Sequence, residues 1–317
     1  MRLLLTLGLV FLISHDCSAQ ASNDVLLQVD YPHNNGTIFS LPKVLVIYDV
    51  EGPAIKQGVL PEDISFAIDG KPVPERAFGN CAICAGPHPT ILARRVPWAL
   101  TDGIHSMHAT IHRPEHPEII RDIIYRVDTT VPNLTGLSGG ILYPGAETAN
   151  STSIRGGVRF SLSGTGNSGL WGGGTMGFKA HGFYGGIEAI GDLDTPSTGH
   201  STLTGNFKLG LMGQHTPFEA SVGSVHGDAF GVVGYHSNPS WVRASVGAGS
   251  GRLPGLWSSV SWGPEIFRLT AEAGSGGTWN YGATLYHPYG LRASLYRVHP
   301  EYGREETVVM MSASLKI

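Results

Sequence analysis

Cys81 and Cys84 are the first residues whose type and spacing suggest chemistry, because they form a Cys-x-x-Cys motif. A redox-active pair of this kind normally begins a helix that lowers the thiolate pKa, and nothing after Cys84 has a helical pattern. A zinc site would need a second ligand pair with matching spacing, which the sequence lacks. In an exported chain an even pair favours a disulfide. We therefore expect Cys81 and Cys84 to form a disulfide that closes a small loop.

No other spacing predicts catalysis. The sequence has no P-loop, no dinucleotide-binding glycine pattern and no HExxH motif, and no Gly-x-Ser-x-Gly lies between a strand and a helix. His105, His108 and His112 share one predicted strand, whose straight edge does not make metal ligands converge. We expect no catalytic residue, no cofactor, no metal site and no enzymatic activity. The simplest interpretation of the histidines scattered over later strand ends and turns is that of polar aromatics without a special role: His181, His200, His215, His226, His236, His287 and His299.

Residues 1–19 have the pattern of a secretory signal peptide. Arg2 is followed by the apolar run Leu3–Ile13, which is too short to span a bilayer as a helix. Cleavage after Ala19 would remove Cys17. A lipoprotein alternative would acylate Cys17, although Asp16 stands where a small residue is expected.

The composition divides the chain near residue 133. The protein has 317 residues, 15% of them charged, and a net charge of −4. It therefore lacks the excess of positive charge that is typical of nucleic-acid-binding proteins. Of 44 glycines, 36 follow residue 133. We predict an all-β chain with an N-terminal unit over 22–132, a linker over 133–153 and a second unit over 154–317.

Residues 22–132 contain short β-branched runs separated by turn signals. Runs such as 64–68 and 119–127 are separated by turns such as Asp69-Gly70 and Asp102-Gly103, and Asp-Gly between apolar runs is a strong hairpin signal. Strands at this spacing predict a two-sheet sandwich.

Four motifs of this half resemble bacterial Ig-like domains when taken in order. They are Tyr31-Pro32-His33-Asn34-Asn35-Gly36, Asp69-Gly70-Lys71-Pro72-Val73, Leu100-Thr101-Asp102-Gly103-Ile104-His105, and Tyr125-Arg126-Val127-Asp128-Thr129-Thr130-Val131-Pro132. The resemblance implies an extracytoplasmic binding, adhesion or spacer module without catalytic activity. It also implies that His105 has a structural role.

Residues 154–317 alternate apolar and polar residues over segments of about nine to eleven residues, the length of a tilted membrane-crossing strand. In 154–162, for example, Ile154, Val158 and Phe160 oppose Arg155 and Arg159. A soluble sandwich would bury the apolar face, whereas a membrane barrel would turn it toward lipid. Aromatic residues near segment ends and an apolar alternation that runs to Ile317 favour an antiparallel transmembrane β-barrel of about 10–12 strands. This half resembles Gram-negative outer-membrane barrels.

Six charged residues would then face the barrel lumen: Arg155, Arg159, Arg243, Arg268, Glu272 and Arg292. They could line a selective pore, or they could form a salt-bridge network that fills a narrow barrel.

The leading functional hypothesis is a non-enzymatic outer-membrane protein, surrounded by lipid, whose Ig-like domain binds a protein or glycan partner in an adhesion or scaffolding role. The alternatives are a small channel with an Arg-lined lumen and a soluble secreted glycan-binding β-protein. No nucleic-acid partner is expected.

Overall fold

The computed structural model describes residues 26–39, 45–51, 63–74, 78–79, 92–95, 98, 100–112, 117–163, 168–195, 200–213, 216–237, 241–253, 255–263, 267–287, 289–299 and 305–317. In these ranges the regular structure is β-sheet, as the alternation predicts. None of the described segments forms a helix of the length and hydrophobicity that a membrane span needs. Residues 1–19, Cys81 and Cys84 lie outside these ranges, so the signal peptide and the disulfide stay predictions.

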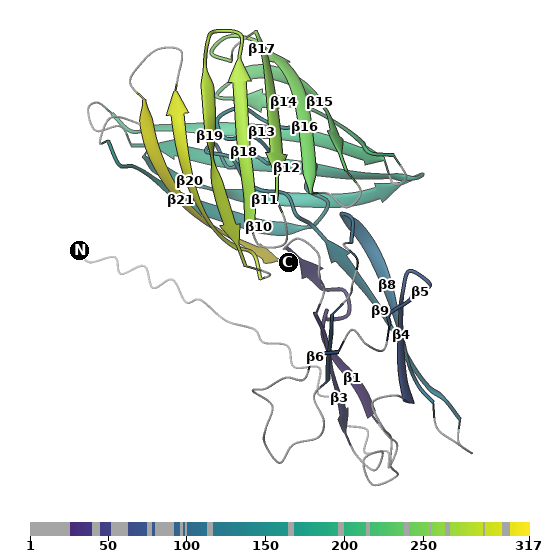
Figure 1. Ribbon diagram of the computed structural model, residues 1–317. Helices are drawn as coiled ribbons and strands as arrows, with labels where there is room; N and C mark the ends of the chain where they lie inside the picture. Colours follow the sequence, from purple (N-terminus) through teal and green to yellow (C-terminus); the bar gives the residue numbers. More distant parts are fainter. Residues whose placement is uncertain are drawn as a thin grey trace, which may run out of the picture.

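The N-terminal unit contains two small sheets (Figure 1). One has the strand order β1-β3-β7-β6, with strands β1 (Leu26–Tyr31), β3 (Leu45–Glu51), β7 (Leu92–Arg95) and β6 (Phe78–Gly79). The other has the order β2-β9-β8-β4-β5, with strands β2 (Thr37–Ile38), β9 (Ile119–Val127), β8 (Gly103–Ile111), β4 (Ile64–Ile68) and β5 (Lys71–Pro72).

The core of this unit lies on one face of the second sheet. Alternate residues of β4, β8 and β9 point into it, among them Phe66, Met107 and Ile123. Val29 of β1, which belongs to the other sheet, and Trp98 pack against the same core. The period-2 pattern of the sequence thus places one face of each of these strands in the core.

The second unit is a closed antiparallel barrel of twelve strands, in which each strand pairs with the next and β10 closes onto β21 (Figure 1). The predicted barrel is therefore confirmed, at the upper end of the expected strand number. The glycine-rich region 172–192 forms two long strands that turn at His181-Gly182. The strands are β10 (Ser153–Ser161), β11 (Gly169–Ala180), β12 (Phe183–Asp194), β13 (Thr202–Gly213), β14 (Phe218–Val225), β15 (Asp228–His236), β16 (Val242–Gly249), β17 (Leu256–Trp262), β18 (Phe267–Gly274), β19 (Trp279–Tyr286), β20 (Leu291–His299) and β21 (Glu306–Lys316).

The two units meet at the barrel end where β10 begins and β21 finishes. Asp102, from the predicted Asp-Gly turn before β8, forms an ion pair with Arg243 of β16. It also accepts hydrogen bonds from the backbone N–H (2.9 Å) and the hydroxyl (2.8 Å) of Thr129. The ring of Phe39 lies 5.9 Å from the guanidinium of Arg292. The N-terminal unit therefore contacts the barrel through buried polar groups and through the buried ring of Phe39.

Asp69 and His105 connect two turns within the N-terminal unit. Asp69 lies at the left-handed position of the β4–β5 turn, with φ of 52°. Its carboxylate lies 2.6 Å from Nδ1 of His105 and accepts the N–H of Ser106 at 2.9 Å. His105 Nε2 lies 2.8 Å from the carbonyl oxygen of Thr101. His105 therefore connects these two turns through its two ring nitrogens, which is a structural role.

We predict that Asp69→Asn destabilises the N-terminal unit by about 1 kcal/mol at neutral pH, a value reduced because Asp69 is half exposed. Asn tolerates the left-handed turn, so the change removes charge and keeps the backbone. Burial alone would raise the pKa of Asp69, but the hydrogen bonds and charge of His105 and the bonds from Ser106 outweigh it and hold the pKa below its usual value of 3.8. The stabilisation is complete above the unfolded pKa and disappears as pH falls through the lowered folded value.

Urea unfolding of the full chain, followed by circular dichroism at several pH values, measures this difference. Asp122→Asn is the control, because Asp122 pairs with His108 on the surface and is far more exposed. Equal effects of the two substitutions at pH 7 would contradict the assignment to the Asp69 contacts.

Candidate functional site

The barrel interior is occupied by the segment between the two units. Residues 128–153, which include the stretch that we expected only to act as a linker (133–153), are almost entirely buried. Leu134, Leu137 and Ile141 pack with Trp171 and Val298 of the barrel wall in one hydrophobic cluster. The segment is therefore an internal plug, and we call residues 128–152 the plug below.

Carboxylates of the barrel wall bind backbone N–H groups of the plug. Glu272 of β18 accepts the N–H groups of Ile141 (2.7 Å), Leu142 (2.7 Å) and Tyr143 (3.3 Å). Glu188 of β12 accepts the N–H of Ser138 at 2.8 Å. A buried backbone donor without a partner costs about 1–3 kcal/mol, so each of these carboxylates replaces the water that the plug loses inside the barrel.

Cationic side chains of the wall bind plug carbonyl groups in the same way. Lys208 of β13 donates to the carbonyl oxygen of Ser138 at 2.7 Å, and Arg159 donates to that of Leu134 at 2.7 Å. Arg268 donates to the carbonyl oxygen of Thr129 at 3.1 Å. The irregular backbone of the plug is thus satisfied by the wall, as a segment enclosed in protein requires.

Two carboxylates of the plug form ion pairs with the barrel wall near the junction end. Glu147 lies 2.8 Å from Arg268 and 3.2 Å from Arg243. Burial alone would raise the pKa of Glu147, but the charges of Arg268 and Arg243 outweigh it and hold the pKa below its usual range. Asp128 lies 3.4 Å from Arg155. Both carboxylates therefore remain ionised at neutral pH and attach the plug electrostatically to three strands, β10, β16 and β18.

All six residues that we expected to line a lumen lie on the inner face of the barrel wall and are buried: Arg155, Arg159, Arg243, Arg268, Glu272 and Arg292. Five of them bind residues of the plug directly, and one of these, Arg243, also binds Asp102 of the N-terminal unit. Arg292 instead donates to the hydroxyl of Ser314 at 3.0 Å and lies over Phe39. These charges belong to a packed polar interior.

Sequence reasoning missed several interior groups: Glu188, Asp192 and Glu219, together with the role of Lys208. Lys208 stands between Phe207 and Leu209 and so alternates with apolar residues, which means that the alternation contained its position. Glu188 and Asp192 lie in the glycine-rich stretch, where glycine on both faces hides the alternation. No signal in the sequence indicated that the segment before residue 153 lies inside the barrel.

Glycines on the inner face of consecutive strands make room for the plug. A Cβ atom on Gly177 of β11 would lie 2.1 Å from the carbonyl oxygen of Asn150, and one on Gly186 of β12 would lie 1.8 Å from that of Ala149. On Gly210 of β13 it would lie 2.6 Å from the hydroxyl of Thr148. Part of the high glycine content of this half therefore serves the close approach of plug and wall.

The plug leaves little empty space near the junction. A cavity of about 20 Å³ lies between the plug and strands β14–β18, room for no more than a water molecule or so. A larger cavity of about 600 Å³ opens at the opposite end, where plug residues Leu142 and Tyr143 face the turns after β14 and β16. The described interior thus has one filled end and one recessed end.

The outer surface of the barrel has the opposite character. Among the described residues, every exposed large apolar side chain except Ile120 and Ile124 belongs to the barrel half. The fold and the site together define the class of this protein. It is a closed twelve-stranded antiparallel barrel with an apolar exterior and a charged interior that is filled by a plug. Comparison with models of protein families, with curated proteins and with solved structures finds no match to this chain.

We predict that Gly186→Ala displaces the plug, because the added methyl group would overlap the Ala149 carbonyl. Overpacking of this kind costs about 1–3 kcal/mol. The expected result is a lower unfolding temperature and faster hydrogen exchange in residues 146–150, measured by mass spectrometry.

Gly191→Ala in the same strand is the matched control. Gly191 is exposed, and its added methyl group would meet only an oxygen at 3.7 Å. If the two variants behave alike, the plug does not lie against β12.

Proposed function

We propose that this chain is a non-enzymatic outer-membrane β-barrel protein, and that its N-terminal Ig-like unit binds a protein or glycan partner in an adhesion or scaffolding role. The main support for the proposal is that the barrel has apolar side chains outside and charged side chains inside, the reverse of a soluble protein. Side chains such as Leu170, Val246 and Leu295 point outward from three different strands, each about half exposed, while Arg159, Arg243 and Arg268 point inward. A soluble barrel of this kind would expose a large continuous apolar surface to water.

The aromatic side chains support the same proposal. Trp262 and Trp279 are exposed at the ends of β17 and β19, whereas Trp171 and Trp257 pack against the plug. Exposed aromatic rings near strand ends are typical of the two interfaces of a bilayer.

Turn lengths support a periplasmic position for the Ig-like unit. At the barrel end that contacts this unit, consecutive strands are joined by two to five residues, and at the opposite end by up to seven. Outer-membrane barrels have short periplasmic turns and longer extracellular loops. The recessed cavity would then face the cell exterior.

The plug argues against the channel alternative. Glu272, Lys208 and Arg159 are engaged with plug backbone, and so they are not free to line a water-filled path. A binding or scaffolding role needs no pore, so the filled interior favours it over conduction. The soluble glycan-binding alternative differs from our proposal in what surrounds the outer face of the barrel, which would be water instead of lipid. A substitution on that face distinguishes the two.

We predict that Val246→Arg lowers the stability of the folded barrel by about 2–4 kcal/mol when the protein is in a bilayer, the cost of a cation near the membrane midplane. On a water-exposed surface the same substitution would have an effect within about 0.5 kcal/mol. Refolding into phospholipid vesicles, scored by heat-modifiable migration on a denaturing gel, measures the difference.

Ile124→Arg is the control for this experiment, because Ile124 is equally exposed but lies in the N-terminal unit. The control should refold as the unmodified chain does. If Val246→Arg is also neutral and the unmodified chain remains soluble without detergent, the membrane proposal is wrong and the soluble alternative takes its place.

We further predict that the unmodified chain forms no stable ion-conducting pore in a planar lipid bilayer, because the plug fills the barrel near the junction. Steady single-channel steps from protein that is verified as folded would contradict this and favour the channel alternative.

A further inference from the structure

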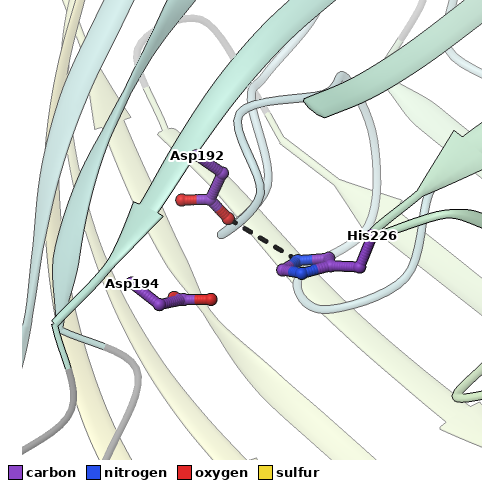
Figure 2. A group of neighbouring side chains, drawn as sticks. All are labelled: Asp192, Asp194 and His226. Atoms are coloured by element: carbon purple, nitrogen blue, oxygen red, sulfur yellow. Dashed lines mark ion pairs between the residues drawn. The ribbon is translucent and has the colours of Figure 1, made fainter. Parts of the chain in front are cut away.

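Two aspartates and a histidine meet at the rim of the recessed cavity (Figure 2). Asp192 and Asp194 are alternate residues at the end of β12, so their side chains lie on the same inner face. His226 comes from the tight turn between β14 and β15, and Figure 2 shows its ring directed toward both carboxylates. One potential ligand atom from each residue lies within 4.8 Å of the others. Asp194 and His226 also line the cavity.

Contacts around the group orient its members. Arg159 donates to Oδ1 of Asp192 at 2.6 Å and also to Oδ1 of Asp194. The second oxygen of each carboxylate is therefore left for another partner. The hydroxyl of Thr204 lies 3.3 Å from Nδ1 of His226. If Nδ1 carries the proton, the lone pair of Nε2 is directed toward the aspartates, as a metal-binding histidine requires.

The remaining acceptor atoms have no hydrogen-bond donor among the described residues, although Oδ2 of Asp192 and Nε2 of His226 form an ion pair when the imidazole is protonated. Oδ2 of Asp192 belongs to a side chain only 2% exposed, and among the described residues no donor lies within hydrogen-bond distance of it. The nearest group is Nε2 of His226 at 3.7 Å, too far for a hydrogen bond. A distance of 3.7 Å is, however, close to the separation of about 3.4 Å between two ligands on one tetrahedral ion with bonds of about 2.1 Å. A carboxylate oxygen of a nearly buried side chain, with no hydrogen-bond donor and close to an imidazole nitrogen, points to a shared cation.

We propose that Asp192, Asp194 and His226 bind one divalent transition-metal ion of the zinc type at the cavity end of the barrel. One imidazole nitrogen with two carboxylate oxygens suits Zn²⁺ and its neighbours, whereas Ca²⁺ takes six to eight oxygen ligands. Three protein ligands leave a position open toward the cavity, where an oxygen or nitrogen atom of a bound partner completes the coordination. The side chain of Arg159 neutralises part of the carboxylate charge and fixes the ligand geometry. The inference goes beyond the proposed function and does not depend on membrane insertion.

The test is titration of the folded, untagged full chain with Zn²⁺ by isothermal calorimetry, after treatment with a chelator. His226→Asn is the decisive variant, because it removes the imidazole while Asn keeps the left-handed conformation that His226 adopts, with φ of 53°. His181→Asn is the matched control, since His181 precedes a glycine in the equivalent two-residue turn at the other end, with φ of 38°. Heat-modifiable migration establishes that both variants are folded.

We expect one saturable site in the unmodified chain and in His181→Asn, and at least tenfold weaker binding in His226→Asn. Co²⁺ provides a second readout, because a four- or five-coordinate site gives visible absorption bands that His226→Asn should lose. The proposal is overturned if the unmodified chain shows no saturable Zn²⁺ binding, or if His226→Asn binds Zn²⁺ as tightly as His181→Asn.

Discussion

An irregular chain segment enclosed in a barrel must satisfy its backbone polar groups without water, and the rest of this structure depends on that requirement. The plug satisfies some of these groups itself, as where the N–H of Leu134 donates to the carbonyl oxygen of Ile141. The wall supplies further partners: carboxylates for N–H groups and cations for carbonyl groups. Each of these side chains is a charge that would be costly to bury alone. Plug and wall therefore stabilise each other, and removal of either leaves buried charge in the other.

The same requirement explains the composition of the barrel strands. Where the plug backbone approaches the wall, the wall residue is glycine, as at Gly177 and Gly186. Where the plug presents a polar group, the wall residue is charged, as at Glu272 and Lys208. The outer face has neither constraint and carries most of the exposed large apolar side chains of the described residues. The inner face is thus specified by the plug, and the outer face by the surroundings of the barrel.

The barrel could be predicted from the sequence because its signal is local: a two-residue period that places Arg155 and Arg159 opposite Ile154 and Phe160. The period places the arginines on one face, and the aromatic residues near segment ends favour the arrangement in which that face points inward. The plug could not be predicted, since residues such as Ile141, Leu142 and Tyr143 have no period and find their partner more than a hundred positions away, at Glu272. The Asp192–Asp194–His226 group was missed for the same reason, because the pairing of β12 with β13 and of β13 with β14 brings His226, in the turn after β14, to the aspartates.

Both ends of the plug lie at the same mouth of the barrel. The chain enters from β9 of the N-terminal unit, reaches the recessed end near Leu142, and returns to begin β10 at Ser153. The barrel therefore surrounds a loop and not a threaded strand, and no chain end has to pass through the ring of hydrogen bonds. In topological terms the plug loop and the ring of strands are not linked. The twelve strands can close around the loop during assembly, and a force applied at the N-terminal unit can withdraw the loop without opening the seam between β10 and β21.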